Sequence, residues 1–250
     1  MSKETAVVVG VTGAFGSVIA RKLIEAGLSV VGVARDSDAL EAMQDALGAS
    51  FLPCTANIGE DAAIAAIAGC LPDAPVAMVV HSVGLPVAGG VASAPPDALT
   101  AACNLKASGF VRLVRAVEGR LRRGSRLVAI GGHYGFEPSP YAATAGVANA
   151  ALANLVRQMS WAYGPEGITA HLLAPGPADT ERLRKVAKAR AEHAGTPFDV
   201  EYEAMRSDSA IGAFTTAEQV AWAVALLLAP EADALAGSSL GLDSGRRHGL

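Results

Sequence analysis

The stretch Thr5-Ala-Val-Val-Val-Gly10-Val-Thr-Gly13-Ala-Phe-Gly16 decides the fold. Its first half is a short apolar run, typical of a strand buried on both faces of a parallel sheet. Three glycines then follow at intervals of three residues, and a helix is predicted over residues 17–26. A strand, a glycine turn and a helix in this order predict the beginning of a βαβ unit.

The same alternation continues along the chain. Further strands are predicted over residues 28–34, 50–55, 76–81, 126–130, 168–173 and 238–242, and further helices over 36–47, 60–70, 96–123 and 141–163. This spacing predicts a single-domain, Rossmann-like α/β fold: a doubly wound parallel sheet of about seven strands with helices on both faces, covering residues 1–250. Residues 179–209 are charged and helical in pattern, lie outside this rhythm, and are predicted to form a substrate lid.

Composition excludes several classes of protein. The 20 basic and 24 acidic residues leave a net charge of −4, so no electrostatic feature favours nucleic acid or an anionic membrane as a partner. The longest apolar stretch, residues 220–229, is too short to span a bilayer, and the chain opens on a strand, so we expect a cytoplasmic protein. Cys54, Cys70 and Cys103 lack metal-ligand spacing; we expect reduced thiols and no metal.

The glycine turn carries the first functional hypothesis. Glycine lets the backbone turn sharply and approach a pyrophosphate, whose negative charge the helix N-terminus stabilises. A turn that keeps glycine only for packing is the alternative. The position after an N-terminal strand and before a helix favours nucleotide binding.

Motifs at the other strand ends make the chain resemble the short-chain dehydrogenase/reductase family. Asn57-Ile58 is similar to the family's Asp-Val pair, His81-Ser-Val-Gly84 to N-N-A-G, and Pro175-Gly176-Pro-Ala-Asp-Thr180 to P-G-x-x-x-T. Tyr141-Ala-Ala-Thr-Ala145 resembles the Y-x-x-x-K active-site turn, with alanine in place of the lysine. The resemblance spans roughly residues 5–245 and implies a small-molecule substrate and a nicotinamide dinucleotide as cofactor.

Carried over position by position, the resemblance implies a set of cofactor-binding residues: Gly10, Gly13, Phe15, Gly16, Arg35, Asn57, Ile58, Gly84, Pro175, Gly176 and Thr180. The tip of the second strand reads Ala34-Arg35, without the acidic residue that would select NAD. An arginine fork matches the geometry of a 2′-phosphate, which favours NADP. NAD is the alternative, because Asp36 could still turn toward a ribose.

The catalytic residues implied by the resemblance are Tyr141 and Asn104, and we add His133 as a functional candidate. A free tyrosine has a pKa of about 10, and in the family a lysine lowers it. Ala145 supplies no charge, and glycine fills the serine position after the fifth strand. His133 could act as acid or base because its ordinary pKa lies near neutrality. The other two candidates for a replacement cation are Arg182 and Lys106.

Several secondary expectations complete this picture. Because Lys106 is two residues from Asn104 on one helix, it is expected to face elsewhere and to be a poor replacement. Ser139 is expected to be a helix N-cap and His81 a hydrogen-bonded structural residue. By resemblance, the helices over 96–123 and 141–163 should pair copies of the chain into a homodimer or homotetramer.

Three functions remain open on these grounds. The first is an NADP(H)-dependent oxidoreductase with a modified catalytic group, acting on a small or medium apolar carbonyl, alcohol or related substrate. The second is a lyase or isomerase that uses the same scaffold. The third is a nucleotide-binding protein without turnover.

Overall fold

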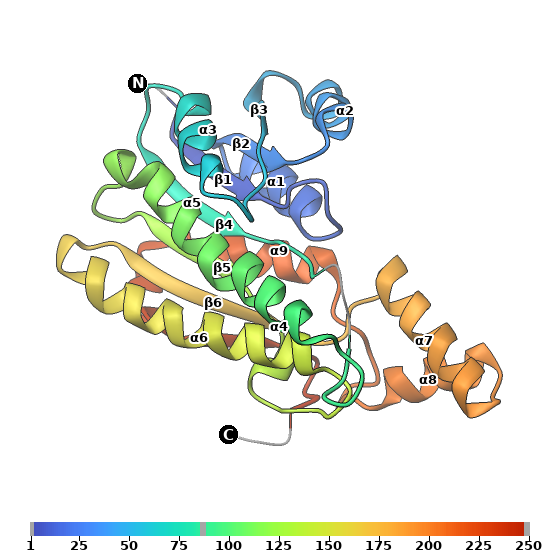
Figure 1. Ribbon diagram of the computed structural model, residues 1–250. Helices are drawn as coiled ribbons and strands as arrows, with labels where there is room; N and C mark the ends of the chain where they lie inside the picture. Colours follow the sequence, from blue (N-terminus) through green and yellow to red (C-terminus); the bar gives the residue numbers. More distant parts are fainter. Residues whose placement is uncertain (1–2, 86–88, 248–250) are drawn as a thin grey trace.

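The computed structural model describes residues 3–85 and 89–247, and its centre is one parallel sheet of seven strands in the order β3-β2-β1-β4-β5-β6-β7 (Figure 1). The strands are β1 (Thr5–Val9), β2 (Ser29–Ala34), β3 (Phe51–Thr55), β4 (Val76–His81), β5 (Arg126–Ile130), β6 (Thr169–Pro175) and β7 (Ser239–Leu242). The predicted fold class and strand number are therefore confirmed, with strand boundaries shifted by at most two residues.

Helices cover both faces of this sheet (Figure 1). They are α1 (Gly16–Glu25), α2 (Ser37–Leu47), α3 (Ala62–Cys70), α4 (Pro96–Cys103), α5 (Gly109–Val117), α6 (Ala143–Tyr163), α7 (Glu181–Ala194), α8 (Phe198–Ser207) and α9 (Ala217–Leu226). Residues from α1, α2 and α9 form the core on one face, and residues from α3, α5 and α6 form the core on the other.

Burial on both faces explains why the strands are continuous apolar runs. In β1, Ala6 and Val8 pack into the core beneath α1 and α9, whereas Val7 and Val9 pack into the core beneath α5 and α6. Successive side chains of a strand point to opposite faces, so both sets must be apolar when both faces are covered.

The region predicted as one helix over residues 96–123 is interrupted. A π-helical turn, Asn104–Ser108, separates α4 from α5, and a 3₁₀ turn follows α5 at Glu118–Arg120. The prediction of an unbroken helix was wrong because residue periodicity does not reveal a single wide turn. Such turns are frequent at functional sites.

The helix predicted over residues 141–163 begins two residues later, at Ala143. Tyr141 therefore lies in the preceding turn. The expectation that Ser139 caps this helix was wrong: its Oγ accepts a hydrogen bond from the Tyr141 backbone N–H (3.3 Å), and Ala142 is the N-cap residue. Asp36, by contrast, does cap α2 by accepting from the Ala39 N–H (3.1 Å).

The strand order reverses between β1 and β4, because β2 and β3 follow β1 on one side and β4 to β7 continue on the other. In such sheets, ligands bind at the carboxyl ends of the strands on either side of this reversal. Helices α7 and α8 project from the same edge (Figure 1). No helix formed by the described residues has the length and apolar character needed to cross a membrane.

Candidate active site

The glycine turn between β1 and α1 forms an exposed cradle. Gly10 has a φ of +77°, and its carbonyl accepts a hydrogen bond from the Gly13 N–H (3.0 Å). A Cβ on Gly16 would lie 2.2 Å from the Gly10 carbonyl oxygen and 2.7 Å from the Val11 Cα. Only glycine at position 16 therefore lets the N-terminus of α1 close on the turn. Phe15, the N-cap residue of α1, packs on the core and anchors it.

The polar side chains on the β2–β3 side of the cradle differ in their ion pairs and hydrogen bonds. Arg35 directly follows β2, is exposed, and makes no ion pair with any residue in the described part of the chain. Asn57 is folded into a turn: its Oδ1 accepts from the Gly59 N–H (3.2 Å) and its Nδ2 donates to Glu60 (2.6 Å). Ile58 is buried. This arrangement leaves Arg35 as the group available to a phosphate.

Predicted residues on the other side of the strand reversal are also at the carboxyl edge. Gly84 follows β4, is exposed, and has open space where a Cβ would lie. Gly176 directly follows Pro175, the last residue of β6, and a Cβ there would lie 2.8 Å from the Asp243 Cα. Thr180 caps α7 by accepting a hydrogen bond from the Leu183 N–H (3.3 Å). The cradle, Arg35 and these residues all follow the carboxyl ends of strands, which is the edge where doubly wound sheets bind dinucleotides.

A cavity of about 280 Å³ opens where the chain after β5 meets the turn before α6 and the α7–α8 region. Eight of its nine lining residues are polar or charged: His133, Tyr134, Glu137, Pro138, Ser139, Tyr141, Arg190, Asp208 and Arg246. Both arginines are paired, Arg190 with Glu201 (3.8 Å) and Arg246 with Asp208. This lining favours a polar ligand in this cavity.

His133 is a buried, neutral base at this cavity. Its side chain is 5% exposed, and it hydrogen-bonds to the backbone of Pro175, while its Nε2 is buried without a hydrogen-bond partner among the described residues. Burial, reinforced by the charge of Arg246, lowers the pKa of His133 to about 4. The pKa of His133 in the folded protein thus lies below the ordinary value on which the sequence argument was based. At neutral pH the unprotonated ring can accept a proton or a hydrogen bond from a ligand.

Tyr141 lies at the rim of the same cavity and is 79% exposed. Four residues later, where the family has a lysine, Ala145 packs beside Leu85, Ala102 and Ala148. The ring of Tyr134, which is half-buried, lies against the His133 ring, with the centroids 3.9 Å apart and the ring planes tilted by 38°. The structure thus brings Tyr141 and His133 together and adds Tyr134, with an apolar contact in place of the missing cation.

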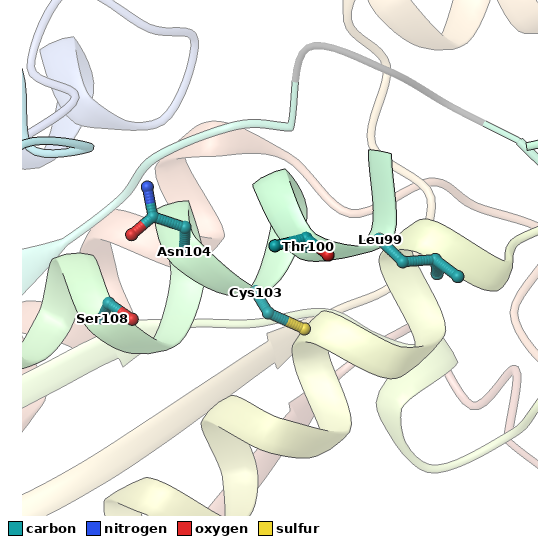
Figure 2. Close-up of a pocket in the computed structure, with 5 residues that line it drawn as sticks. All are labelled: Leu99, Thr100, Cys103, Asn104 and Ser108. Atoms are coloured by element: carbon teal, nitrogen blue, oxygen red, sulfur yellow. The ribbon is translucent and has the colours of Figure 1, made fainter. Parts of the chain in front are cut away.

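Asn104, the third predicted catalytic residue, lies elsewhere. Its Nδ2 donates to the Gly59 carbonyl (2.9 Å), and its Oδ1 accepts from Arg112 (2.9 Å). Figure 2 shows its amide pointing away from α6, whereas the sulfur of Cys103 points toward α6. The Asn104 amide therefore ties the π-helical turn to the loop after β3, and the structure does not place it at the cavity with Tyr141.

Lys106 turns in the opposite direction and is buried, with 6% of its surface exposed. Its Nζ donates a hydrogen bond to the carbonyl of Ile130, the last residue of β5 (2.8 Å). The expectation that Lys106 and Asn104 face different ways is confirmed. The face it takes is the one toward the strand ends. The side chain of Arg182, the other candidate, lies outside the described residues.

The sequence contained an unused signal for Lys106. Residues 106, 110, 113, 114 and 117 are all buried and follow the helical spacing i, i+4, i+7, i+8 and i+11. Lys106 thus lies on the buried stripe of this helical region. Asn149, which is buried against the Gly132 turn, was also missed; it lies one turn after Ala145 on α6.

Three buried histidines make stability depend on pH. Burial is the main cause that lowers the pKa of His81 to about 3 and those of His133 and His171 to about 4. Below about pH 6.5 the unfolded chain therefore binds protons that the folded chain does not. The free energy of unfolding decreases as the pH is lowered through this range. We expect each histidine to contribute a slope of about 1.4 kcal/mol per pH unit between pH 5 and 6.

Urea unfolding at pH 5.0, 5.5, 6.0 and 7.5 measures this slope. In the folded protein His171 bonds Thr169 (2.7 Å) and the Leu235 carbonyl (3.1 Å). His171→Gln should reduce the slope by the contribution of one histidine, because glutamine does not titrate. A slope that is the same in the variant and the parent would contradict the assignment.

His81 Nε2 is hydrogen-bonded to the Leu105 carbonyl (2.9 Å), which confirms its predicted structural role.

Comparison with known proteins identifies the family. The family model described as enoyl-(acyl carrier protein) reductase matches residues 10–247. The chain belongs to the short-chain dehydrogenase/reductase family. It is 29% identical over 233 residues to an inactive 2-(S)-hydroxypropyl-CoM dehydrogenase 2 of Xanthobacter autotrophicus, a match that covers 91% of this chain and 98% of that relative.

Solved structures share the fold at low sequence identity. A short chain oxidoreductase from Pseudomonas aeruginosa PAO1, bound to NADPH and described as containing an atypical catalytic center, is 22% identical with a TM-score of 0.86 over 99% of this chain and 98% of that one. L-sorbose reductase from Gluconobacter frateurii, complexed with NADPH and L-sorbose, is 20% identical with a TM-score of 0.89 over 100% and 98%. At this level of identity these matches support the fold alone.

Proposed function

We propose that this protein is an NADP(H)-dependent oxidoreductase that acts on a small or medium polar carbonyl or alcohol and uses a modified catalytic group. The observation that carries the proposal is the Gly10–Gly16 cradle with the exposed Arg35 beside it. NADP(H) would supply hydride chemistry when bound. Gly10, Gly13 and Gly16 would hold the pyrophosphate at the N-terminus of α1, and Arg35 the 2′-phosphate.

The substrate would occupy the polar cavity before α6. His133, uncharged at neutral pH, would accept a hydrogen bond through Nε2 from a substrate hydroxyl, which would give that buried nitrogen a partner. Tyr141 at the rim, covered by the bound substrate, would exchange the proton with the substrate oxygen. Helices α7 and α8 would act as the lid, because Arg190 and Asp208, which line the cavity, belong to them or directly follow them.

Replacing Arg35 tests the cofactor assignment. Arg35→Ala should raise the Kd for NADPH by about 10- to 100-fold, since a hydrogen bond to a charged group contributes about 1.5–3 kcal/mol. The Kd for NADH, which lacks the 2′-phosphate, should change by about twofold or less. Isothermal titration calorimetry measures both values.

Arg21→Ala removes another exposed arginine from α1 and is the matched control. It should leave both dissociation constants unchanged. Equal losses for NADPH and NADH in Arg35→Ala, or no loss in either, would reject Arg35 as the 2′-phosphate ligand. If the unmodified protein binds neither dinucleotide, the proposed function fails as a whole.

The second candidate function is dinucleotide binding without turnover. It is favoured by the exposed phenol of Tyr141 and the apolar surroundings of Ala145. The relative from Xanthobacter is named as inactive. NADPH oxidation with a panel of polar ketones, followed at 340 nm, separates the two candidates: binding without oxidation of any member favours the second.

We also propose that the protein is a cytoplasmic homodimer or homotetramer that pairs through the region from α4 to α5 and through α6. Val147 and Trp161 on α6 are exposed (51% and 84%), and a surface hollow of about 550 Å³ lies along α4 and the π-helical turn (Figure 2). Its lining residues are Leu99, Thr100, Cys103, Asn104 and Ser108. Apolar groups left exposed in this way are typical of interfaces.

A further inference from the structure

We infer that close glycine contacts seat the turn of residues 131–135, the His133 turn, on α6. Gly132, Gly135 and Gly146 are then positioning residues that hold His133 beside the cavity. The inference rests on the proposed function, in which His133 accepts a hydrogen bond from the substrate. It concerns the place after β5 where glycine stands instead of the family's serine.

Gly135 leaves no room for a side chain between the His133 turn and α6. A Cβ at this position would lie 2.9 Å from the backbone carbonyl carbon of Asn149 and 3.1 Å from the Ala150 backbone nitrogen. The backbone of a helix cannot rotate aside as a side chain can. Any residue larger than glycine must therefore lift the turn away from α6.

Two further glycines bring the turn and the helix together. A Cβ on Gly132 would lie 2.9 Å from Nδ2 of Asn149, whose side chain is buried. A Cβ on Gly146, which belongs to α6, would lie 3.3 Å from the Tyr134 carbonyl oxygen. Glycine inside a helix is destabilising relative to alanine, and this close carbonyl gives it a reason to stand there.

The end of β6 holds the other side of the His133 turn. The Gly131 N–H donates to the Leu173 carbonyl (2.8 Å), and His133 hydrogen-bonds to the backbone of Pro175. The His133 ring is buried, and the cavity lies beside it. A displacement of the turn from α6 would therefore move this ring and admit water to it.

These contacts distinguish a remodelled site from one that has only lost a side chain. A glycine left behind by a simple loss would face open space, as Gly69 and Gly164 do, where an added Cβ meets nothing within 4 Å. Gly132 and Gly135 instead pack against α6. The place of the serine has become a contact that fixes a histidine.

Proton NMR of the histidine rings measures the placement of His133. Its signal is identified by its loss in His133→Gln. In the parent this signal should hardly move between pH 7.5 and 5.0, because burial and the charge of Arg246 lower the pKa of His133 to about 4. Gly135→Ala should raise this pKa by about one unit or more, since water then reaches the ring. The charges of Arg246, Asp243 and Glu137, which also act on the ring, are the same in both proteins.

Gly32→Ala is the matched control for a loss of stability alone. Its Cβ would lie 2.2 Å from the Phe51 ring in the core beneath α1, on β2, which β1 and β4 separate from β5. This variant should have a lower melting temperature than the parent and leave the His133 titration unchanged. A purely structural role of Gly135 predicts the same pair of results for Gly135→Ala.

An unchanged His133 titration in folded Gly135→Ala overturns the inference. If Gly135→Ala does not fold, Gly132→Ala and Gly146→Ala decide, because their added Cβ meets a side-chain amide or a more distant carbonyl. A raised pKa of His133 in either supports the inference, and an unchanged pKa in both overturns it. Failure of the parent to bind NADPH overturns the proposed function, whereas the titration alone decides what holds His133.

Discussion

Gly16→Ala is expected to abolish dinucleotide binding, raising the Kd for NADPH by about a hundredfold or more, which corresponds to roughly 3 kcal/mol. The added Cβ would lie 2.2 Å from the Gly10 carbonyl oxygen and 2.7 Å from the Val11 Cα. Both atoms belong to the backbone, so no side chain can move to relieve the overlap. The N-terminus of α1 must shift away from the turn, and the amide groups that would face the pyrophosphate in the proposed site shift with it.

Calorimetry with NADPH measures this loss, and urea unfolding measures the accompanying loss of stability, about 1–3 kcal/mol for an overpacked site. Gly69→Ala is the matched control, because it lies in α3 with nothing within 4 Å of an added Cβ. It should bind NADPH normally and gain up to about 1 kcal/mol of stability from the better helix former. Normal NADPH affinity in Gly16→Ala would mean that the phosphates bind elsewhere.

Arg126→Met should give the largest loss of stability among the variants considered, about 3 kcal/mol in the free energy of unfolding. Arg126 is 3% exposed at the start of β5. Its guanidinium donates to the Leu227 carbonyl (2.8 Å), the Ala229 carbonyl (3.1 Å) and the Thr169 hydroxyl (2.9 Å), and it pairs with Asp233. Methionine keeps much of the apolar stem and leaves these carbonyls without their charged donor.

The melting temperature should fall by about 10 °C, given roughly 2–4 °C per kcal/mol for a chain of this size. Arg120→Met is the matched control: Arg120 pairs with Asp73 at the surface, where the two side chains are 41% and 96% exposed. Exposed ion pairs contribute about 1 kcal/mol or less, so this variant should stay close to the parent. Equal effects of the two substitutions would show that the buried donor does not stabilise the end of α9.

The local structure of the proposed cofactor site could be predicted from sequence because each part of it depends on neighbouring residues. The glycine turn needs only a strand before it and a helix after it, and Arg35 needs only to follow β2. The carboxyl ends of parallel strands meet at one edge, so the strand order then gathers these residues without further information. The structure confirms that gathering and adds the reason why Gly16 cannot carry a side chain.

The catalytic half could not be predicted in the same way. The helix predicted over residues 96–123 is interrupted by a π-helical turn. The low pKa of His133 depends on its burial and on the charge of Arg246, which is 113 residues away in sequence. Residue spacing describes which face of a regular helix a side chain takes. It cannot describe a helix that changes its period, or a pKa that depends on distant groups.

Local sequence pattern is therefore sufficient for the order of the elements, the parallel sheet and the position of the phosphate cradle, because hydrophobic periodicity and glycine geometry act over a few residues. The polar lining of the cavity before α6 and the separation of Asn104 from Tyr141 come only from the folded chain. Each of these depends on burial and charge contributed by segments far apart in sequence, which come together only when the core packs.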